Sequence, residues 1–178
     1  DGDITLNGPG NDFKGTVNGK GHNITLSDVN DITLGDVSAD EDFKITAGGD
    51  INQDNTSPNK IVVGGKTDLT ADGDITLDGS NNDFKGTVNA EGKNITLSDE
   101  NGIILGDVNS GEDFKVSAGG DITQDNTNGK KIIVAGATDL SSGGRVVLDG
   151  KENKLTKGVT IKAVSYVVEG DDRKAADE

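Results

Sequence analysis

Hydrophobic residues recur along the chain as short Ile, Val and Leu triplets separated by polar turns. In Ile24-Thr25-Leu26, a period of two residues places Ile and Leu on one face and Thr on the other, as in a half-buried strand. We expect eight such strands across positions 1–71: ITL at Ile4, GTV at Gly15, ITL at Ile24, ITLGDV at Ile32, FKITA at Phe43, DINQ at Asp50, IVV at Ile61 and TDL at Thr67. Gly, Asn and Asp clusters such as NGKGHN supply the turns between them, and no 3.6-residue stripe favours helix.

The chain is built from a repeated sequence unit. Residues 1–71 align with 72–142 without a gap, and 48 of the 71 positions are identical. GGRVVLDG at Gly143 begins a third copy, so residues 143–170 are interpreted as a partial, divergent third unit or a cap. Residues 171–178 form a charged tail. We expect one continuous solenoid, because each unit of such a repeat covers the open face of its neighbour.

The strand pattern and the period together predict an all-β fold, a right-handed parallel β-helix. Turns of roughly 20 to 24 residues would give three or four turns per unit and a rod on the order of 40 Å long. The residues expected to face inward are Ile4, Leu6, Ile24, Leu26, Ile32 and Leu34, with their counterparts Ile75, Leu77, Ile95, Leu97, Ile103 and Leu105. The four Phe residues recur at matching positions and are expected to fill the core.

The composition excludes several classes of partner and predicts a narrow hydrophobic core. Only 30% of residues are hydrophobic, and the 32 acidic and 17 basic residues give a net charge of −15. This charge repels nucleic acid and anionic lipid, and no apolar run approaches the roughly 18 residues that a membrane span requires. The chain has no Cys, so disulfides and thiolate metal sites are excluded. Because Asp1 opens no signal-peptide pattern and Met is absent, we interpret the sequence as a segment of a longer precursor.

Catalytic chemistry is not expected. The single histidine, His22, lies in a turn and is replaced by Lys93 in the second copy. An isolated His without a partner triad is weak evidence for catalysis. The carboxylates lie mostly in turns, where Asp beside Gly caps the backbone, and no aromatic subsite accompanies them. We therefore predict no enzyme activity and no cofactor.

Calcium binding is the main alternative to a purely structural role for the turns. Gly8-Pro9-Gly10-Asn11-Asp12 resembles the calcium-binding nonapeptide GGxGxDxUx, and its counterpart contains Asn82 and Asp83. The motif occurs once per repeat unit rather than in tandem, which favours a structural turn. Asn11, Asp12, Asn82 and Asp83 are nevertheless the candidate calcium ligands.

Three sequons begin at Asn23, Asn55 and Asn94 and are candidate glycosylation sites. The alternative is that these Asn side chains stack in ladders along the rod, and we prefer it. Outward Thr residues raise ice binding as a further alternative, because Thr25 matches Thr96 in the next copy. The row of outward Thr residues is interrupted at other positions, which disfavours ice binding.

The set GDITL, NDFKGTV, NITLSD, ILGDV, DFKVSAGGDITQ and KIIVAGATDL resembles the long repeats of filamentous-haemagglutinin-like exoproteins. The resemblance covers about residues 1–150. It implies a β-helical shaft exported by two-partner secretion and placed at the bacterial cell surface or secreted. It also implies a structural role in an adhesin, with neighbouring repeats as partners. Independently of the resemblance, an excised solenoid has open ends, so we expect end-to-end self-association through the first turn. Direct recognition of a host glycan or protein is the alternative.

Overall fold

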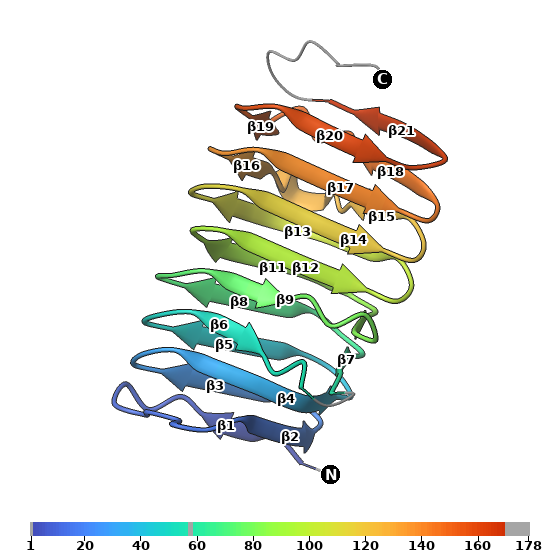
Figure 1. Cartoon of the computed structure of the whole chain (residues 1–178). Helices are drawn as coiled ribbons and strands as arrows, with labels where there is room; N and C mark the ends of the chain where they lie inside the picture. The colour runs from blue at the N-terminus through green and yellow to red at the C-terminus, as the bar shows by residue number, and fades with distance from the viewer. Residues whose placement is uncertain (1, 57–58, 170–178) are drawn as a thin grey trace.

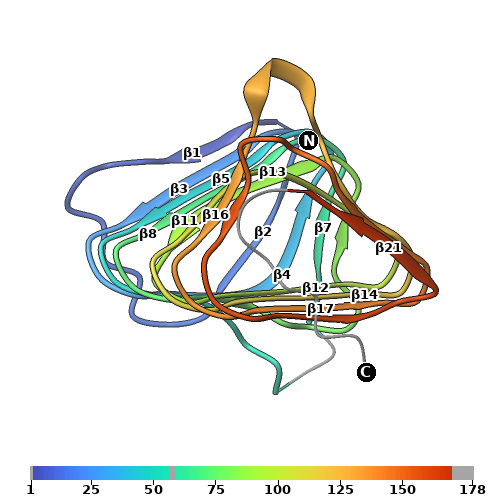
Figure 2. The same ribbon diagram turned by 90° about the horizontal axis from the view of Figure 1, so that it is seen from above.

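The computed structural model describes residues 2–56 and 59–169, and these form a parallel β-solenoid of about 8 turns (Figure 1). The chain coils counter-clockwise as it rises towards the viewer of Figure 2, so the coil is right-handed, as predicted. Stacked strands lie about 4.8 Å apart, which makes the rod about 40 Å long. The only helical segment among the described residues is the single 3-10 turn at Thr127–Gly129, and no helix there could cross a membrane.

The strands form two parallel sheets of 11 and 10 strands, and these bend around the core into three faces (Figure 2). The first face consists of β1 (Ile4–Leu6), β3 (Ile24–Asp28), β5 (Phe43–Ala47), β8 (Thr67–Ala71), β11 (Thr87–Gly92), β16 (Ile132–Val134) and β19 (Lys154–Leu155). The second consists of β6 (Ile51–Gln53), β9 (Ile75–Leu77), β12 (Ile95–Asp99), β14 (Phe114–Ala118), β17 (Thr138–Ser142) and β20 (Val159–Lys162). The third consists of β7 (Ile61–Val63), β10 (Asp83–Phe84), β15 (Ile122–Gln124), β18 (Arg145–Leu148) and β21 (Ser165–Val168).

Several strands continue from one face to the next. In β4 (Ile32–Ala39) the first half pairs with β6 and the second half with β7. In β13 (Ile103–Ser110) the two halves pair with β15 and β16 in the same way. β2 (Val17–Gly21) pairs with both halves of β4, with a register shift after Val17. These bends close the sheets around one core.

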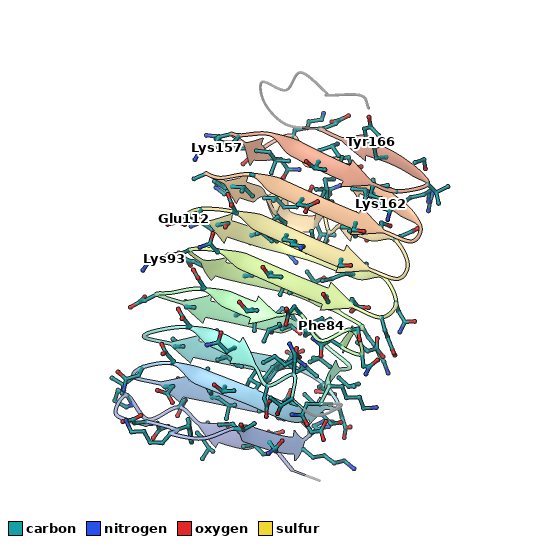
Figure 3. The ribbon with its side chains drawn as sticks, viewed as in Figure 1. Phe84, Lys93, Glu112, Lys157, Lys162 and Tyr166 are labelled. Carbon is teal, nitrogen blue, oxygen red and sulfur yellow. The ribbon has the colours of Figure 1, made fainter. Side chains whose placement is uncertain are left out.

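The core follows the predicted alternation of inward and outward residues. Phe43, Phe84 and Phe114 are completely buried, and Phe84 lies inside the middle turns in Figure 3. Ten of the twelve residues expected inside are buried. The other two lie in the first turn, where Ile4 is half-buried and Leu6 is 46% exposed because none of the described residues forms a turn beneath them. The strand expected at Gly15 begins instead at Val17, after the bend at Gly15-Thr16.

One copy of the repeat covers three and one-third turns. On the first face β3, β5, β8 and β11 stack in that order, so three turns separate β3 from β11. β12, the counterpart of β3, follows β11 in the chain but stacks on β9 of the second face. The next counterpart, β21, stacks on β18 of the third face. Each copy is therefore rotated by one third of a turn and advanced by about 16 Å relative to the previous copy.

The rotation moves each feature of the repeat to a new corner of the rod. The loop between β6 and β7 projects between the second and third faces. Its counterpart, which contains the 3-10 turn, lies between β15 and β16, at the corner between the third and first faces (Figure 2). Thr25 and Thr96 are separated in the same way, since they lie on β3 and β12. The matching Thr residues that suggested an ice-binding row therefore lie on different faces.

Glycines at the corners allow the turns to stack closely. A Cβ at Gly119 would lie 2.1 Å from the carbonyl oxygen of Glu100 in the turn below, well inside any real contact. At Gly15, by contrast, nothing lies within 4 Å of the Cβ position. Glycine is thus required where backbone meets backbone between turns, as at Gly119, and not in every turn.

Candidate functional site

Asp and Asn side chains at the corners form ladders along the rod. Each side-chain oxygen accepts a hydrogen bond from the backbone N–H of the residue above it. Asp3 Oδ1 accepts from Asn23 N at 3.1 Å, Asn23 Oδ1 from Asp42 N at 3.1 Å, and Asp42 Oδ1 from Lys66 N at 2.8 Å. These bonds satisfy corner N–H groups that point away from the regular strand ladder. They explain why so many acidic residues lie beside glycine in the turns.

A second ladder runs along another corner, through Asp31, Asp50, Asp74, Asn94 and Asp113, with steps of 2.8 to 3.1 Å. This ladder starts in the first copy and continues through the second without interruption, which joins the two copies along one edge of the rod.

A buried pair of amides forms the central joint between successive copies. Gln53 Nε2 donates to Asn82 Oδ1 at 2.8 Å, and Asn82 Nδ2 donates to Gln53 Oε1 at 2.8 Å. Gln53 Oε1 also accepts from Gly79 N, and Asn82 Oδ1 also accepts from Ile61 N. Asn82 is 0% exposed and Gln53 is 8% exposed, so the pair is buried. Gln53 belongs to the first copy and Asn82 to the second.

The same joint recurs at the matching positions of the next copy. Gln124 Nε2 donates to Asn153 Oδ1 at 2.8 Å, and Asn153 Nδ2 donates back to Gln124 Oε1 at 2.7 Å. Gly150 and Ile132 supply the equivalent backbone donors. Because the Gln–Asn pair occurs at both junctions between copies, it is a regular structural feature of the repeat.

The four candidate calcium ligands do not come together. Asn11-Asp12 and Asn82-Asp83 lie three and one-third turns apart, and both side-chain ends of Asn82 are bonded inside the joint. A hydrogen bond from Lys14, at 2.6 Å, holds the pKa of Asp12 below its usual value. In residues 2–56 and 59–169 no three His, Cys, Asp or Glu side chains are grouped to hold a metal ion. The turn at Asn11 is closed by hydrogen bonds from Asn11 N to Gly8 O at 3.1 Å and from Asn11 Nδ2 to Leu6 O at 3.0 Å.

Two sequon asparagines are members of the ladders. Asn23 Nδ2 donates to Asp3 Oδ1 at 3.0 Å, and Asn94 Nδ2 donates to Asp74 Oδ1 at 3.0 Å. A glycan on either nitrogen would disturb these bonds, which favours the ladder interpretation. Asn55 is exposed and donates to Asp78 Oδ1 at 2.6 Å, while Ser57 of its sequon lies outside the described residues.

The single histidine occupies a corner position next to an acid. His22 Nε2 lies 3.4 Å from Glu41 Oε1, and Glu41 N donates to His22 O. Their counterparts Lys93 and Glu112 lie at the matching corner of the second copy, where Glu112 N donates to Lys93 O at 2.8 Å (Figure 3). His22 therefore occupies a position that takes a basic residue in both copies.

A buried carboxylate, that of Asp99, accepts hydrogen bonds from the backbone of the turn that follows Asn82. Asp99 Oδ2 accepts from Phe84 N and Oδ1 from Asn101 N, both at 2.7 Å. Burial raises the pKa of Asp99 above its usual value, against the lowering effect of these two bonds. Asp28 makes the equivalent pair of bonds in the first copy. Two backbone donors thus require both oxygens of one carboxylate.

One open groove of about 600 Å³ lies on the third face, beside β2, β4 and β7. Its polar lining comes from Asn18, Lys20, Asp36, Ser38 and Lys60. Asp36 is bonded to the backbone N–H of Lys60 at 3.0 Å, so its carboxylate has a structural role. The groove is the surface at which the alternative function, direct binding of a glycan or protein, would be tested first.

Neither the Gln–Asn pairs nor the backbone hydrogen bonds to the buried carboxylates of Asp28 and Asp99 were predicted from the sequence. A signal was present, because Gln53 and Gln124 stand at matching positions within GGDI-QDNT, a segment that differs between the copies only at Asn52 and Thr123. Of their Asn partners, 29 residues further on, Asn82 was considered only as a candidate calcium ligand, and Asn153 was given no role. A buried polar pair is invisible to a period-2 pattern, since Gln and Asn both read as surface residues.

Comparison with known proteins identifies the repeat. Residues 1–19, 21–91 and 92–162 match the family described as repeats of unknown function, DUF5649. Its two full matches are adjacent and of equal length, in agreement with the 71-residue period. No curated protein and no solved structure matches the chain. Because the matched segments cover most of its length, the chain belongs to the DUF5649 repeat family.

Proposed function

We propose that this chain is a structural shaft segment of a secreted or cell-surface bacterial fibre, which projects or links adhesive parts. The observation that carries the proposal is the uninterrupted joint between copies, made by the buried Gln53–Asn82 pair and the corner ladder through Asp50, Asp74 and Asn94. A spacer needs rigidity along its length, and bonds that cross every copy boundary supply it.

The proposal includes a non-catalytic role. Support comes from the carboxylates, because those of the ladders and of Asp99 accept backbone hydrogen bonds between turns. A catalytic acid would instead need access to substrate at a groove. The resemblance to filamentous-haemagglutinin-like repeats supports export by two-partner secretion and an extracellular location.

The charge of the rod bears on its partners. The net charge of −15 on the chain opposes side-by-side packing of rods, and salt screens that repulsion. The ends differ, because the first turn exposes the apolar Leu6 and the last turn exposes Tyr166 (Figure 3). We propose neighbouring repeats as the main partners and weak end-to-end association at high concentration.

The test is the length of tandem chains. Small-angle scattering on proteins with two, four and six full copies should give rods that lengthen by about 16 Å per copy without a change in cross-section. Flexible or collapsed arrays would contradict the shaft. Glycan-array and cell-binding assays on the same proteins test the alternative, and saturable binding by a single rod would make it a binding module.

Calcium is tested separately, by melting with calcium and with a chelator at equal ionic strength. Equal melting temperatures are expected, since screening of surface charge depends on ionic strength. A calcium-specific rise would indicate a site around Asn11 and Asp12.

A further inference from the structure

The first turn exposes residues that are buried wherever the same turn recurs. Leu6 is 46% exposed, whereas its counterparts Leu77 and Leu148 are 0% exposed. Phe13 is half-buried, whereas its counterpart Phe84 is 0% exposed. The cause is that the later turns stack on a strand of the preceding copy, since β9 pairs with β6 and β18 pairs with β15, whereas β1 has no such strand beneath it among the described residues.

Asn11 is the first-turn counterpart of Asn82 and Asn153. Its local turn is already formed, since Asn11 N donates to Gly8 O at 3.1 Å and Nδ2 donates to Leu6 O at 3.0 Å. Asn82 makes the same two contacts, with Gly79 and Leu77. Asn82 also has the reciprocal bonds with Gln53, and no described residue makes those bonds with Asn11.

We propose that the first turn is a docking surface for the last turns of another copy of this repeat, and that a glutamine from that copy enters beneath Asn11. Leu6 and Phe13 form the apolar part of the surface, and Asn11 forms its polar centre. This inference rests on the shaft function proposed above and names the residue that recognises the neighbouring copy. The interface is the one already present twice inside the chain, at Asn82 and Asn153.

The pair also selects the rotation at which two copies meet. A rod with three faces could be stacked in three rotational settings, and apolar side chains alone would tolerate each of them. Only one setting brings the glutamine under Asn11. The other two would bury the amide of Asn11 without a partner, and buried polar groups set register in packed repeats for this reason. The setting it selects is the one-third rotation seen between the two full copies.

The test is an extended chain in which a copy of residues 1–71 is placed directly before Asp1, so that the 71-residue spacing continues. Hydrogen exchange at the first-turn amides measures local opening. Asn11→Ala should increase opening less than about 3-fold in the original chain and about 30- to 100-fold in the extended chain, where Asn11 is buried and paired. A control extended chain, in which the added copy carries leucine in place of its glutamine, should show a smaller effect of Asn11→Ala.

Equal effects of Asn11→Ala in the original and extended chains would overturn the docking inference. An equal effect of Asn11→Ala on hydrogen exchange in the extended chains with and without the added glutamine would also overturn it. Scattering on the extended chain separates this failure from failure of the shaft. A rod that lengthens while Asn11→Ala stays neutral refutes the docking inference alone, and an extended chain that does not lengthen refutes the shaft.

Discussion

Replacement of Gln53 by leucine tests the joint between copies while nearly conserving side-chain volume. The change removes three hydrogen bonds, two with Asn82 at 2.8 Å and one with Gly79 N at 3.0 Å. It leaves the N–H of Gly79 buried without that acceptor, while Asn82 Oδ1 keeps its bond from Ile61 N. At about 1 kcal/mol for each bond, and about 1 to 3 kcal/mol for the orphaned donor, the loss is about 4 to 6 kcal/mol.

The buried leucine offsets part of this loss by about 1.5 to 3 kcal/mol through the hydrophobic effect. We therefore expect Gln53→Leu to lower the free energy of unfolding by about 1 to 4.5 kcal/mol. In a chain of this size that corresponds to a fall of about 2 to 18 °C in the melting temperature. Urea unfolding followed by far-ultraviolet circular dichroism measures the change.

Two comparisons sharpen the result. Asn52→Leu removes an amide from the same strand, but from its partly exposed outer side, and should change stability by less than about 0.5 kcal/mol. Gln124→Leu repeats the test at the second joint and should cost about as much as Gln53→Leu. If Gln53→Leu costs no more than Asn52→Leu, the amide pair does not hold the copies together and the reasoning is refuted.

Other positions give independent predictions. Thr67→Val should raise stability by about 1 kcal/mol in thermal unfolding, because the buried Oγ1 of Thr67 has no hydrogen-bond partner among the described residues; no gain would show that the hydroxyl is satisfied in solution. Gly119→Ala should destabilise by more than about 2 kcal/mol while Gly15→Ala changes little, and similar unfolding curves for the two variants would contradict the close stacking. Asp99→Asn should destabilise by about 1 to 3 kcal/mol, because an amide offers one acceptor to two backbone donors; a stabilised variant would show that relief of the buried charge dominates. The melting temperature should fall as pH drops below about 3.8, because carboxylates with a lowered pKa such as Asp121 are protonated more readily in the unfolded state, and their contribution to stability is lost; protonation of Asp99, whose pKa is raised by burial, offsets part of that loss. A melting temperature that does not fall below about pH 3.8 would contradict these shifts.

The strands and the face of each strand could be predicted from the sequence because a period of two residues reports burial directly. Ile24, Leu26, Ile95 and Leu97 are buried as expected. The exposure of Leu6 could not be predicted from the same pattern, since it depends on whether a turn lies beneath it.

The rotation between copies could not be predicted from the hydrophobic pattern of the sequence. It depends on the number of residues in each turn, which is 19 between Ile24 and Phe43 and 24 between Phe43 and Thr67. Corner lengths decide these numbers, and the period of the sequence repeat carries no information on whether they add to a whole number of turns. Thr25 and Thr96, which match in the sequence, therefore lie on different faces.

The candidate site was predicted only in its residue types. Asn23 and Asn94 were expected in ladders, and the structure places them there. Asn82 was considered as a calcium ligand, but it is buried against Gln53. The partner lies 29 residues away, so only the coiling of the chain brings the two amides together.

The rotation and rise per copy are the most direct test of the account, and helical reconstruction of a tandem array by electron cryomicroscopy measures both. An array of identical 71-residue copies should show a rise of about 16 Å and a rotation of about one third of a turn per copy, with the β6–β7 loop on each corner in succession. A rotation close to zero, with matching loops in a single row along one corner, would mean a whole number of turns per copy and would contradict the account.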